Sequence, residues 1–337
     1  MKSLIFFLRI LRPGLLALLL TAICTGSAMA GSVSCWGNSS TMDFGTINLL
    51  DGGVTDSSSV ISYGCSADPG TNILLCMSLG ADPGTQSYNP RYLVLDNSGG
   101  SSTMAFNMYT DSARTVVWGA TGGSYAPVAI TMTMPSGSYS MTGTVPIYGR
   151  IKSAGQAGLP AGWYSTNTRG NWPLTIAYRS YNGAVPKCTN GSLSTVNSGF
   201  YIDASVNSDC RLISSSNMDF GTVFQTLTQN VDTTAAIVVT CNGGQSGNGY
   251  HVLLGDGLNP VSSGGQRRMQ GPNGSLLKYE LYKDAARTTR WGNTDYLGVA
   301  GTGTGQPQTL VVYGRVPSQS VPAAGKYTDT VVITVDY

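Results

Sequence analysis

Residue types that support catalysis or metal binding are scarce in this chain. The 337 residues include one histidine, His251, so a serine–histidine–aspartate triad would have a single possible base, and a histidine-rich metal site is excluded. His251 lies in the alternating run Tyr250-His251-Val252-Leu253-Leu254, which predicts a packed or half-exposed strand residue. The seventeen acidic residues form no distinctive pair for glycosidase chemistry. We therefore expect no enzyme activity, no catalytic residue, no metal site and no cofactor.

A glycine-rich segment resembles a phosphate-binding loop in composition only. Gly301-Thr302-Gly303-Thr304-Gly305 is followed by Pro307 and by no helix start. A phosphate loop depends on the amide groups and dipole at the start of a helix. The segment therefore predicts a plain loop.

The charge of the chain argues against a nucleic-acid partner. The formal net charge is +2, from nineteen basic and seventeen acidic residues. Lys2, Arg9 and Arg12 lie in the first thirty residues, so sixteen basic residues remain against seventeen acidic ones, a net charge of −1. Phosphate binding needs concentrated positive charge, and we expect no nucleic acid as partner.

The first thirty residues have the pattern of a secretory signal peptide. Positive charge is followed by an apolar stretch from Leu15 to Ile23 and by Ala28-Met29-Ala30, a small-residue cleavage site. We assign residues 1–30 to a signal peptide and expect the protein to be secreted through the periplasm to the cell surface.

Six cysteines follow the expected cleavage site, an even number in an oxidising compartment. Disulfides are the expected state of Cys35, Cys65, Cys76, Cys188, Cys210 and Cys241. Six cysteines allow about 15 pairings, so the count alone does not identify the bonds.

The chain is a diverged tandem repeat. Met-Asp-Phe-Gly-Thr occurs at 42–46 and again at 218–222, each time after a cysteine. Three further motifs recur in the same order: Asp111–Gly119 with Asp284–Gly292, Tyr148-Gly149-Arg150 with Tyr313-Gly314-Arg315, and Leu159–Tyr164 with Val321–Tyr327. Motifs that recur in order indicate two copies of one fold.

Each copy has the pattern of an antiparallel β-sandwich. Apolar residues alternate over short runs such as 330–337, turn signals separate the runs, and no amphipathic helix follows the signal peptide. The expected architecture is all-β, with two tandem sandwiches at residues 31–190 and 191–337.

The repeat limits the disulfide pairing. Cys35 and Cys65 occupy the places of Cys210 and Cys241 in the second copy, so we pair them within each copy. Cys76 and Cys188 are left for each other.

Several conspicuous residues are repeated in both copies and are interpreted as structural. Asp111 with Arg114, and Asp284 with Arg287, are spaced alike, which favours a turn or an ion pair over a binding site. Trp118, Trp291, Tyr148 and Tyr313 are interpreted as core or sheet-packing residues.

Taken together, these motifs resemble the spore-coat-protein-U-like domain family, over nearly all of 200–337 and more loosely over 31–180. The resemblance implies a subunit of an archaic chaperone–usher pilus, and a two-domain member is similar to the tip adhesin of a Csu-type pilus. It further implies immunoglobulin-like Greek-key sandwiches, the C-terminal one lacking a strand. A periplasmic pilus chaperone, an outer-membrane usher and an adjacent pilin that donates a strand are the implied partners, and surface attachment and biofilm formation the implied role. The residues assigned to chaperone or donor-strand pairing are Thr330, Val331, Val332, Ile333, Thr334, Val335 and Tyr337.

Two segments bear on strand donation. Gly31-Ser32-Val33-Ser34 is too short to pair along a sheet edge at about 3.3 Å per residue, so we expect the protein to accept a strand and to end the fibre. Phe200, Ile202, Ala204 and Val206 alternate with other residues; this segment either completes the first sandwich or begins the second.

The first copy carries residues that the second lacks. Trp118 and Tyr148 are 30 positions apart, against 22 between Trp291 and Tyr313, and a second excess follows Tyr164. We interpret these segments as exposed apolar loops that bind an abiotic or host surface; the alternative is extra strands that bury them. The adhesive residues would be Tyr125, Val128, Met132, Met134, Tyr139, Met141 and Trp172.

Two other classes of function remain open. A secreted spore-coat or matrix protein could use similar domains without a fibre, and an extracellular hydrolase is the third class. Neighbouring genes for a chaperone and an usher would separate the first class from the second.

Overall fold

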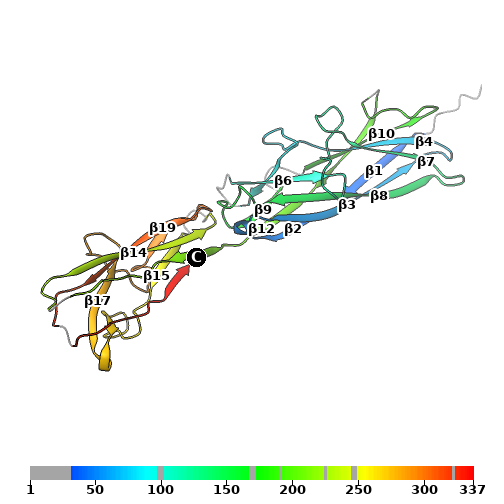
Figure 1. Ribbon diagram of the computed structural model, residues 1–337. Coiled ribbons are helices and arrows are strands. Elements are labelled where there is room, and N and C mark those ends of the chain that lie inside the picture. The colour runs from blue at the N-terminus through cyan, green and yellow to red at the C-terminus, as the bar shows by residue number, and fades with distance from the viewer. Residues whose placement is uncertain are drawn as a thin grey trace, which may run out of the picture. The chain divides into compact units, whose positions relative to one another are not determined.

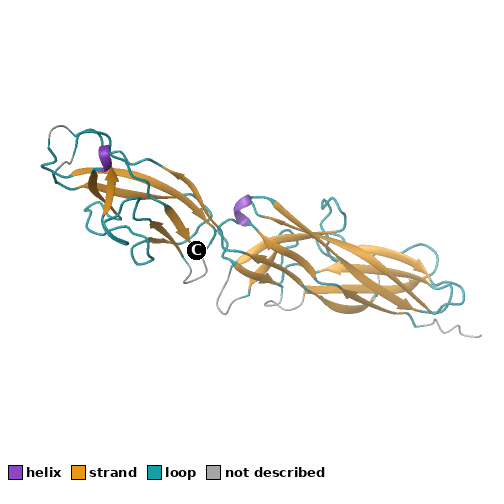
Figure 2. Ribbon diagram, turned by 90° about the horizontal axis from the view of Figure 1, so that it is seen from below, coloured by secondary structure: helices purple, strands orange, loops and turns teal. Residues whose placement is uncertain are grey.

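The computed structural model describes residues 32–96, 102–166, 172–189, 192–223, 226–243, 249–320 and 323–337. The expected signal peptide at 1–30 lies outside these residues. The described chain is all-β, and its helical segments are short 3-10 turns, including Leu49–Asp51 (η1) and Pro272–Gly274 (η3) (Figure 2). No helix in the described ranges is long and apolar enough to cross a membrane.

Two immunoglobulin-like sandwiches follow one another along the chain (Figure 1). The larger sheet of the N-terminal sandwich contains eight strands: Ser34–Ser39 (β1), Met42–Ile47 (β2), Val54–Ser66 (β3), Arg91–Leu95 (β5), Thr103–Tyr109 (β6), Ser140–Lys152 (β8), Gly162–Ser165 (β9) and Ile202–Val206 (β12). Their order is β1-β3-β8-β6-β5-β9-β12-β2. The smaller sheet has the order β11-β10-β4-β7, from Ser194–Phe200 (β11), Trp172–Tyr181 (β10), Asn72–Leu79 (β4) and Val128–Thr133 (β7).

The C-terminal sandwich has the same plan with fewer strands. One sheet has the order β13-β14-β19-β17-β16, from Cys210–Ser215 (β13), Val231–Cys241 (β14), Gln308–Val316 (β19), Leu276–Tyr282 (β17) and Arg267–Gln270 (β16). The other has the order β18-β15-β20, from Val299–Gly301 (β18), Tyr250–Leu254 (β15) and Ile333–Asp336 (β20). Strands β11 and β12 pair within the N-terminal sheets, so the boundary expected at residue 190 lies inside the first sandwich, which extends to Val206.

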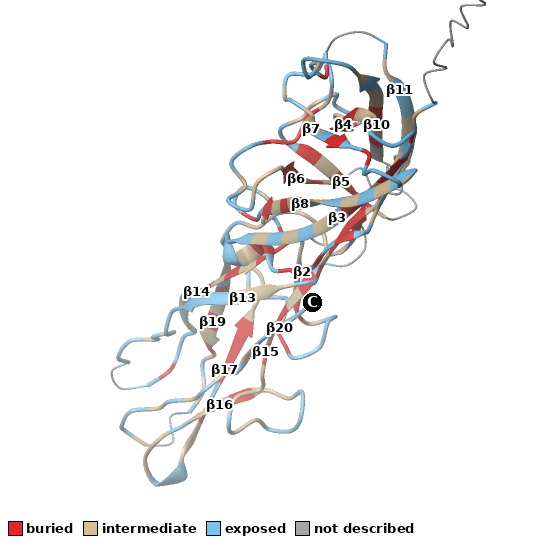
Figure 3. Cartoon of the chain, turned by 90° about the vertical axis from the view of Figure 1, so that its right-hand side faces the viewer, coloured by how far each residue is buried: buried red, intermediate tan, exposed pale blue. Residues whose placement is uncertain are grey.

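Each sandwich has its own hydrophobic core, and Figure 3 colours the buried residues of its strands red. A tryptophan lies at the centre of each core: Trp118 donates its indole N–H to the Met77 carbonyl at 2.9 Å, and Trp291 donates to that of Val252 at 2.7 Å. Trp118 and Trp291 are fully buried, as their repetition predicted. Because these two hydrogen bonds are equivalent, they give a residue-by-residue correspondence between the two sandwiches, in which Met77 corresponds to Val252.

The three disulfides have the pairing that the repeat predicted. Cys35 bonds Cys65 and Cys210 bonds Cys241, each pair directly opposite on neighbouring antiparallel strands. Cys76 of β4 bonds Cys188, closing 112 residues of chain. This bond holds the segment between β10 and β11 on the outer face of the smaller sheet.

The repeated Asp-x-x-Arg motif is a turn. The Asp111 carboxylate accepts hydrogen bonds from the amide groups of Thr115 and Val116, and Arg114 has a left-handed backbone with φ of 59°. Asp284 and Arg287 repeat this turn in the C-terminal sandwich. Each arginine pairs with a carboxylate outside the motif, Asp56 or Asp232, rather than with the aspartate three positions before it.

Candidate functional site

Strand β12 is an internal strand of the N-terminal sandwich, supplied from beyond the first repeat. It runs parallel to β2, with Ile202 opposite Met42, and antiparallel to β9, with Ala204 opposite Tyr164. The preceding strand β11 pairs antiparallel with β10, so residues 194–206 follow β10 and β9 from one sheet into the other. The segment 200–206 therefore completes the first sandwich.

Every second side chain of the segment 200–206 lies in the N-terminal core. Phe200, Ile202, Ala204 and Val206 are all buried in the core cluster. Alternation places these four side chains on one face of the chain, as a strand geometry requires. Residues 200–206 therefore contribute four side chains to the core of the N-terminal sandwich.

The Met and Phe side chains of the repeated Met-Asp-Phe-Gly-Thr motif differ in burial between the two sandwiches. In the N-terminal sandwich Met42 is 0% and Phe44 is 6% exposed, and both side chains lie against Gly149. In the C-terminal sandwich Met218 and Phe220 lie against Gly314 in the same way but are only half-buried. The motif has the same packing in both copies, and its two apolar side chains are covered only where β12 lies beside them.

A groove occupies the corresponding place in the C-terminal sandwich. In the described chain neither 218–222 nor 327–331 belongs to a strand, and no described strand pairs with 218–222 as β12 pairs with β2. A hollow of about 390 Å³ opens there, and both segments line it. Its apolar lining includes Met218, Phe220, Ile237, Met269, Tyr279, Leu281, Val312, Tyr327, Val331 and Ile333.

Strand β20 lies at the end of its sheet beside β15, and no strand of the described residues pairs with its other edge (Figure 3). Leu254 faces Ile333 as Leu79 faces Leu174, so β20 has the place of β10 and Tyr337 that of Tyr178. In the N-terminal sandwich β10 pairs with β11 on this edge. A second hollow of about 430 Å³ lies here, lined by residues that include Cys210, His251, Asp336 and Tyr337.

The residues assigned to strand pairing at 330–337 lie on this edge. Val331, Ile333 and Val335 pack against the C-terminal core. Thr330, Val332, Thr334 and Tyr337 are exposed. Only 333–336 forms a strand, and half-buried His251 of β15 lies opposite Asp336. Pairing of these residues with a chaperone or a donated strand stays a prediction.

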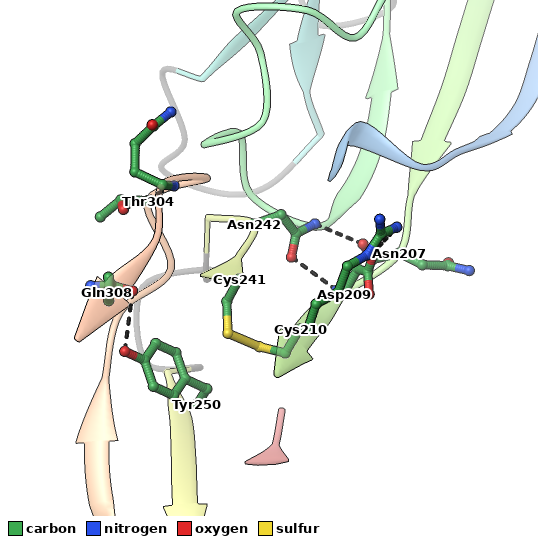
Figure 4. Close-up of a disulfide and its surroundings, with 10 residues drawn as sticks. Asn207, Asp209, Cys210, Cys241, Asn242, Tyr250, Thr304 and Gln308 are labelled. Atoms are coloured by element: carbon green, nitrogen blue, oxygen red, sulfur yellow. Dashed lines mark hydrogen bonds and ion pairs between the residues drawn. A yellow bond between two sulfur atoms is a disulfide. The ribbon is translucent and has the colours of Figure 1, made fainter. Parts of the chain in front are cut away.

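The start of β13, whose Cys210 lines the second hollow, is anchored by hydrogen bonds around Asn242 (Figure 4). Next to the disulfide of Cys210 and Cys241, the Asn242 side chain donates to the Asn207 carbonyl at 2.8 Å and accepts from the Asp209 amide at 2.9 Å. The Asn242 amide in turn donates to the Asp209 carbonyl at 3.0 Å. These bonds, together with the pairing of β13 with β14, hold one wall of the hollow in place.

The residues expected to form an exposed adhesive surface lie in different environments. Met132 of β7 and Met134 are 7% and 1% exposed, and the expectation of exposure is wrong for both. The reason is that the extra segment adds β7 to the edge of β4, which turns these side chains into the core. Val128 and Met141 are partly buried against the same core, Tyr125 packs near Tyr88, and Trp172 begins β10. Tyr139 is 66% exposed. A role of these residues in adhesion stays a prediction.

Two carboxylates face each other where β12 joins β2, and sequence reasoning did not detect them. Asp203 pairs with Asp43 in the parallel register and is 7% exposed. Its Oδ1 atom is buried without a hydrogen-bond partner among the described residues. Burial and the neighbouring Asp43 carboxylate raise the pKa of Asp203 to about 6.

We expect the Asp203→Asn variant to remove a pH dependence of stability. The pKa of Asp203 is higher in the folded protein than the ordinary value of 3.8. Its contribution to stability is therefore fully present below pH 3.8 and is lost as the pH rises through about 6. The unfolding free energy of the parent should therefore fall relative to that of the variant as the pH rises. The difference, variant minus parent, should increase by about 1–2 kcal/mol between pH 5 and pH 7.5. Urea denaturation of both proteins at the two pH values measures it.

Asp56 provides a control of opposite sign. The hydrogen bond from Arg150, at 2.7 Å, holds its pKa below the ordinary range. The Asp56→Asn variant should therefore lose stability relative to the parent as pH rises from 3 to 6. Equal pH profiles of the Asp203→Asn variant and the parent would contradict the assignment to Asp203.

Comparisons with known proteins agree with this two-copy arrangement. The Spore Coat Protein U domain matches residues 19–168 and again 187–334. Protein U of Myxococcus xanthus is 40% identical over 92 residues, which are 26% of this chain and 51% of that protein, so the chain spans about half the length of this relative.

Two solved structures are similar to this chain at low identity. One is the CsuC–CsuE chaperone–tip adhesion subunit pre-assembly complex from archaic chaperone-usher Csu pili of Acinetobacter baumannii, with 18% identity, 90% of this chain and 100% of that chain covered, and a TM-score of 0.46. The other is the CupB6 tip adhesin from Pseudomonas aeruginosa, with 11% identity, 91% and 94% covered, and a TM-score of 0.38.

The two matched ranges cover most of the sequence, and each holds one copy of the repeated motifs. The chain belongs to the Spore Coat Protein U domain family.

Proposed function

We propose that the protein is the tip subunit of a chaperone–usher pilus. Its C-terminal sandwich accepts a strand from the adjacent pilin, and a periplasmic chaperone holds it before the outer-membrane usher. Its N-terminal sandwich attaches to an abiotic or host surface and so promotes biofilm formation; among the predicted adhesive residues, Tyr139 is 66% exposed. The role is one of binding and assembly, without catalysis.

One observation carries the proposal: the same fold occurs twice, and residues 194–206 fill in the first copy the place that is a groove in the second. An added strand supplies main-chain hydrogen bonds to a sheet edge and alternate side chains to pockets. The outer edge of β20 offers main-chain groups for such hydrogen bonds, and the half-buried Met218 and Phe220 line the groove that such side chains would enter. In the described residues the N-terminal sandwich has its corresponding place filled, which leaves the C-terminal groove for a link to a neighbour.

A coat or matrix protein is the second candidate, favoured by the match to Protein U. The same groove could link copies in a coat without a fibre. Adjacent chaperone and usher genes, and loss of the protein from pili when the usher is deleted, distinguish the pilus from the coat.

The test appends a copy of residues 194–206 to Tyr337 of the full chain through a four-residue turn. Because β11 is antiparallel to β10, the copy would enter beside Tyr337 and run back along β20. Burying the copies of Phe200, Ile202 and Val206 should raise the thermal midpoint of the C-terminal sandwich by at least about 10 °C.

The matched control carries Ser at the copies of Phe200, Ile202 and Val206, so that length and backbone are unchanged. Differential scanning calorimetry and hydrogen exchange of β20 compare the two chains. Equal midpoints would refute a missing strand in the C-terminal sandwich.

A further inference from the structure

An acidic residue, Asp219, lies between Met218 and Phe220, which line the groove of the C-terminal sandwich, and its own side chain is exposed. Asp219 has the place of Asp43 in the repeated motif, and its local structure is already formed: its carboxylate accepts from the Gly221 amide at 2.8 Å, as Asp43 accepts from Gly45 at 2.6 Å. Both glycines are left-handed, with φ of 74° and 67°. A strand entering the groove would therefore meet Asp219 where β12 meets Asp43.

A second carboxylate belongs to the groove itself. Asp329 lines it, accepting from the Tyr279 hydroxyl at 2.6 Å and from the Leu258 amide at 2.8 Å. Burial and this hydrogen bond raise the pKa of Tyr279, which keeps the hydroxyl a donor. Among the described residues that line the groove there is no lysine or arginine. The described lining of the groove thus adds a carboxylate and no cation to the charge that an incoming strand meets at Asp219.

The N-terminal sandwich shows what an acidic side chain meets at this position. Asp203 lies opposite Asp43 and between buried neighbours, and its Oδ1 atom has no hydrogen-bond partner in the described chain. Strand β12 is part of the same chain, so a high local concentration offsets this repulsion. A strand from a separate molecule lacks that advantage, and complementary charge would favour its selection.

We propose that the partner strand carries a lysine or arginine at the position that Asp203 occupies in β12. The partner is then a protein segment with the pattern apolar-x-apolar-basic-small-x-apolar, aligned with Phe200, Ile202, Asp203, Ala204 and Val206. The basic side chain pairs with Asp219. This inference rests on the proposed strand acceptance and names the chemistry of the partner.

The experiment uses three full-length chains with the appended copy of residues 194–206, which differ only in having Asp, Asn or Lys at the copy of Asp203. At pH 7.5 and low salt, the thermal midpoint of the C-terminal sandwich should rise in the order Asp, Asn, Lys. The Lys chain should exceed the Asp chain by roughly 3–6 °C, and 1 M NaCl should reduce this difference.

The Asp219→Asn substitution in each chain completes a double-mutant cycle. It retains an acceptor for the Gly221 amide and should remove most of the preference for Lys. A midpoint of the Asp chain equal to or above that of the Lys chain would overturn the basic position, as would a preference that persists in Asp219→Asn. If none of the three chains exceeds the serine control, strand acceptance itself is refuted.

Discussion

The Phe200→Ala variant is expected to lower the unfolding free energy of the N-terminal sandwich by about 3–5 kcal/mol, a large part of the stability of an ordinary domain. Phe200 is fully buried and lies at the point where the chain passes from β11 to β12. Its removal leaves a cavity and weakens the hold of the segment between β2 and β9. Hydrogen exchange during urea denaturation separates the N-terminal sandwich from the C-terminal one.

Thr195→Ala is the matched control, because Thr195 is on the same strand and exposed. Its effect should stay within about 0.5 kcal/mol. In the Phe200→Ala variant, protection of β2 and β9 should fall together with that of β12, since β12 pairs with both. A loss of protection confined to β11 would show that β12 is not part of the cooperative core.

The second large effect is expected at Glu280 in the C-terminal sandwich. Arg267 is fully buried, ion-paired with Glu280, and donates to the carbonyls of Leu254 and Trp291 at 2.7 and 2.9 Å. Glu280→Ala leaves this buried guanidinium without its carboxylate, which costs about 3–5 kcal/mol. The measurement is the thermal midpoint of the C-terminal sandwich in the chain with the appended strand, compared with the same chain carrying Glu280.

The control for Glu280→Ala is Glu280→Gln, and the N-terminal sandwich has an amide side chain at the corresponding contact. There, buried Arg91 donates to the Asn107 side chain at 2.7 Å and to the Trp118 carbonyl at 2.7 Å, and burial lowers its pKa to about 10. An amide thus replaces the carboxylate. Glu280→Gln should accordingly cost less than Glu280→Ala, because the amide oxygen still accepts from Arg267. Equal losses in the two variants would show that charge, and not hydrogen bonding, dominates.

Local sequence and repetition determined much of the fold. The motif at 42–46 and 218–222 specifies the same turn in both copies, because an aspartate carboxylate and a glycine with positive φ are enough to form it. The pairing of Cys35 with Cys65 and of Cys210 with Cys241 followed from their matching places, since neighbouring antiparallel strands bring such residues opposite each other.

Tertiary structure alone decided which strands share a sheet. The alternation at 200–206 reads the same whether the segment completes the first sandwich or begins the second, because period two reveals a buried face but not the partner that buries it. For the same reason, the apolar residues near 130 could be read as an exposed surface. Pairing of β7 with β4 buries Met132 and Met134 instead.

The polar features of the site depended on the same long-range pairing. Asp43 and Asp203 are 160 positions apart and meet only because β12 lies beside β2. Arg267 and Glu280 lie on paired strands and become a buried ion pair only inside the folded core. The sequence by itself determined two copies of one fold and their disulfides, whereas the completed first copy and the open groove of the second arise from contacts between distant strands, which short-range patterns do not encode.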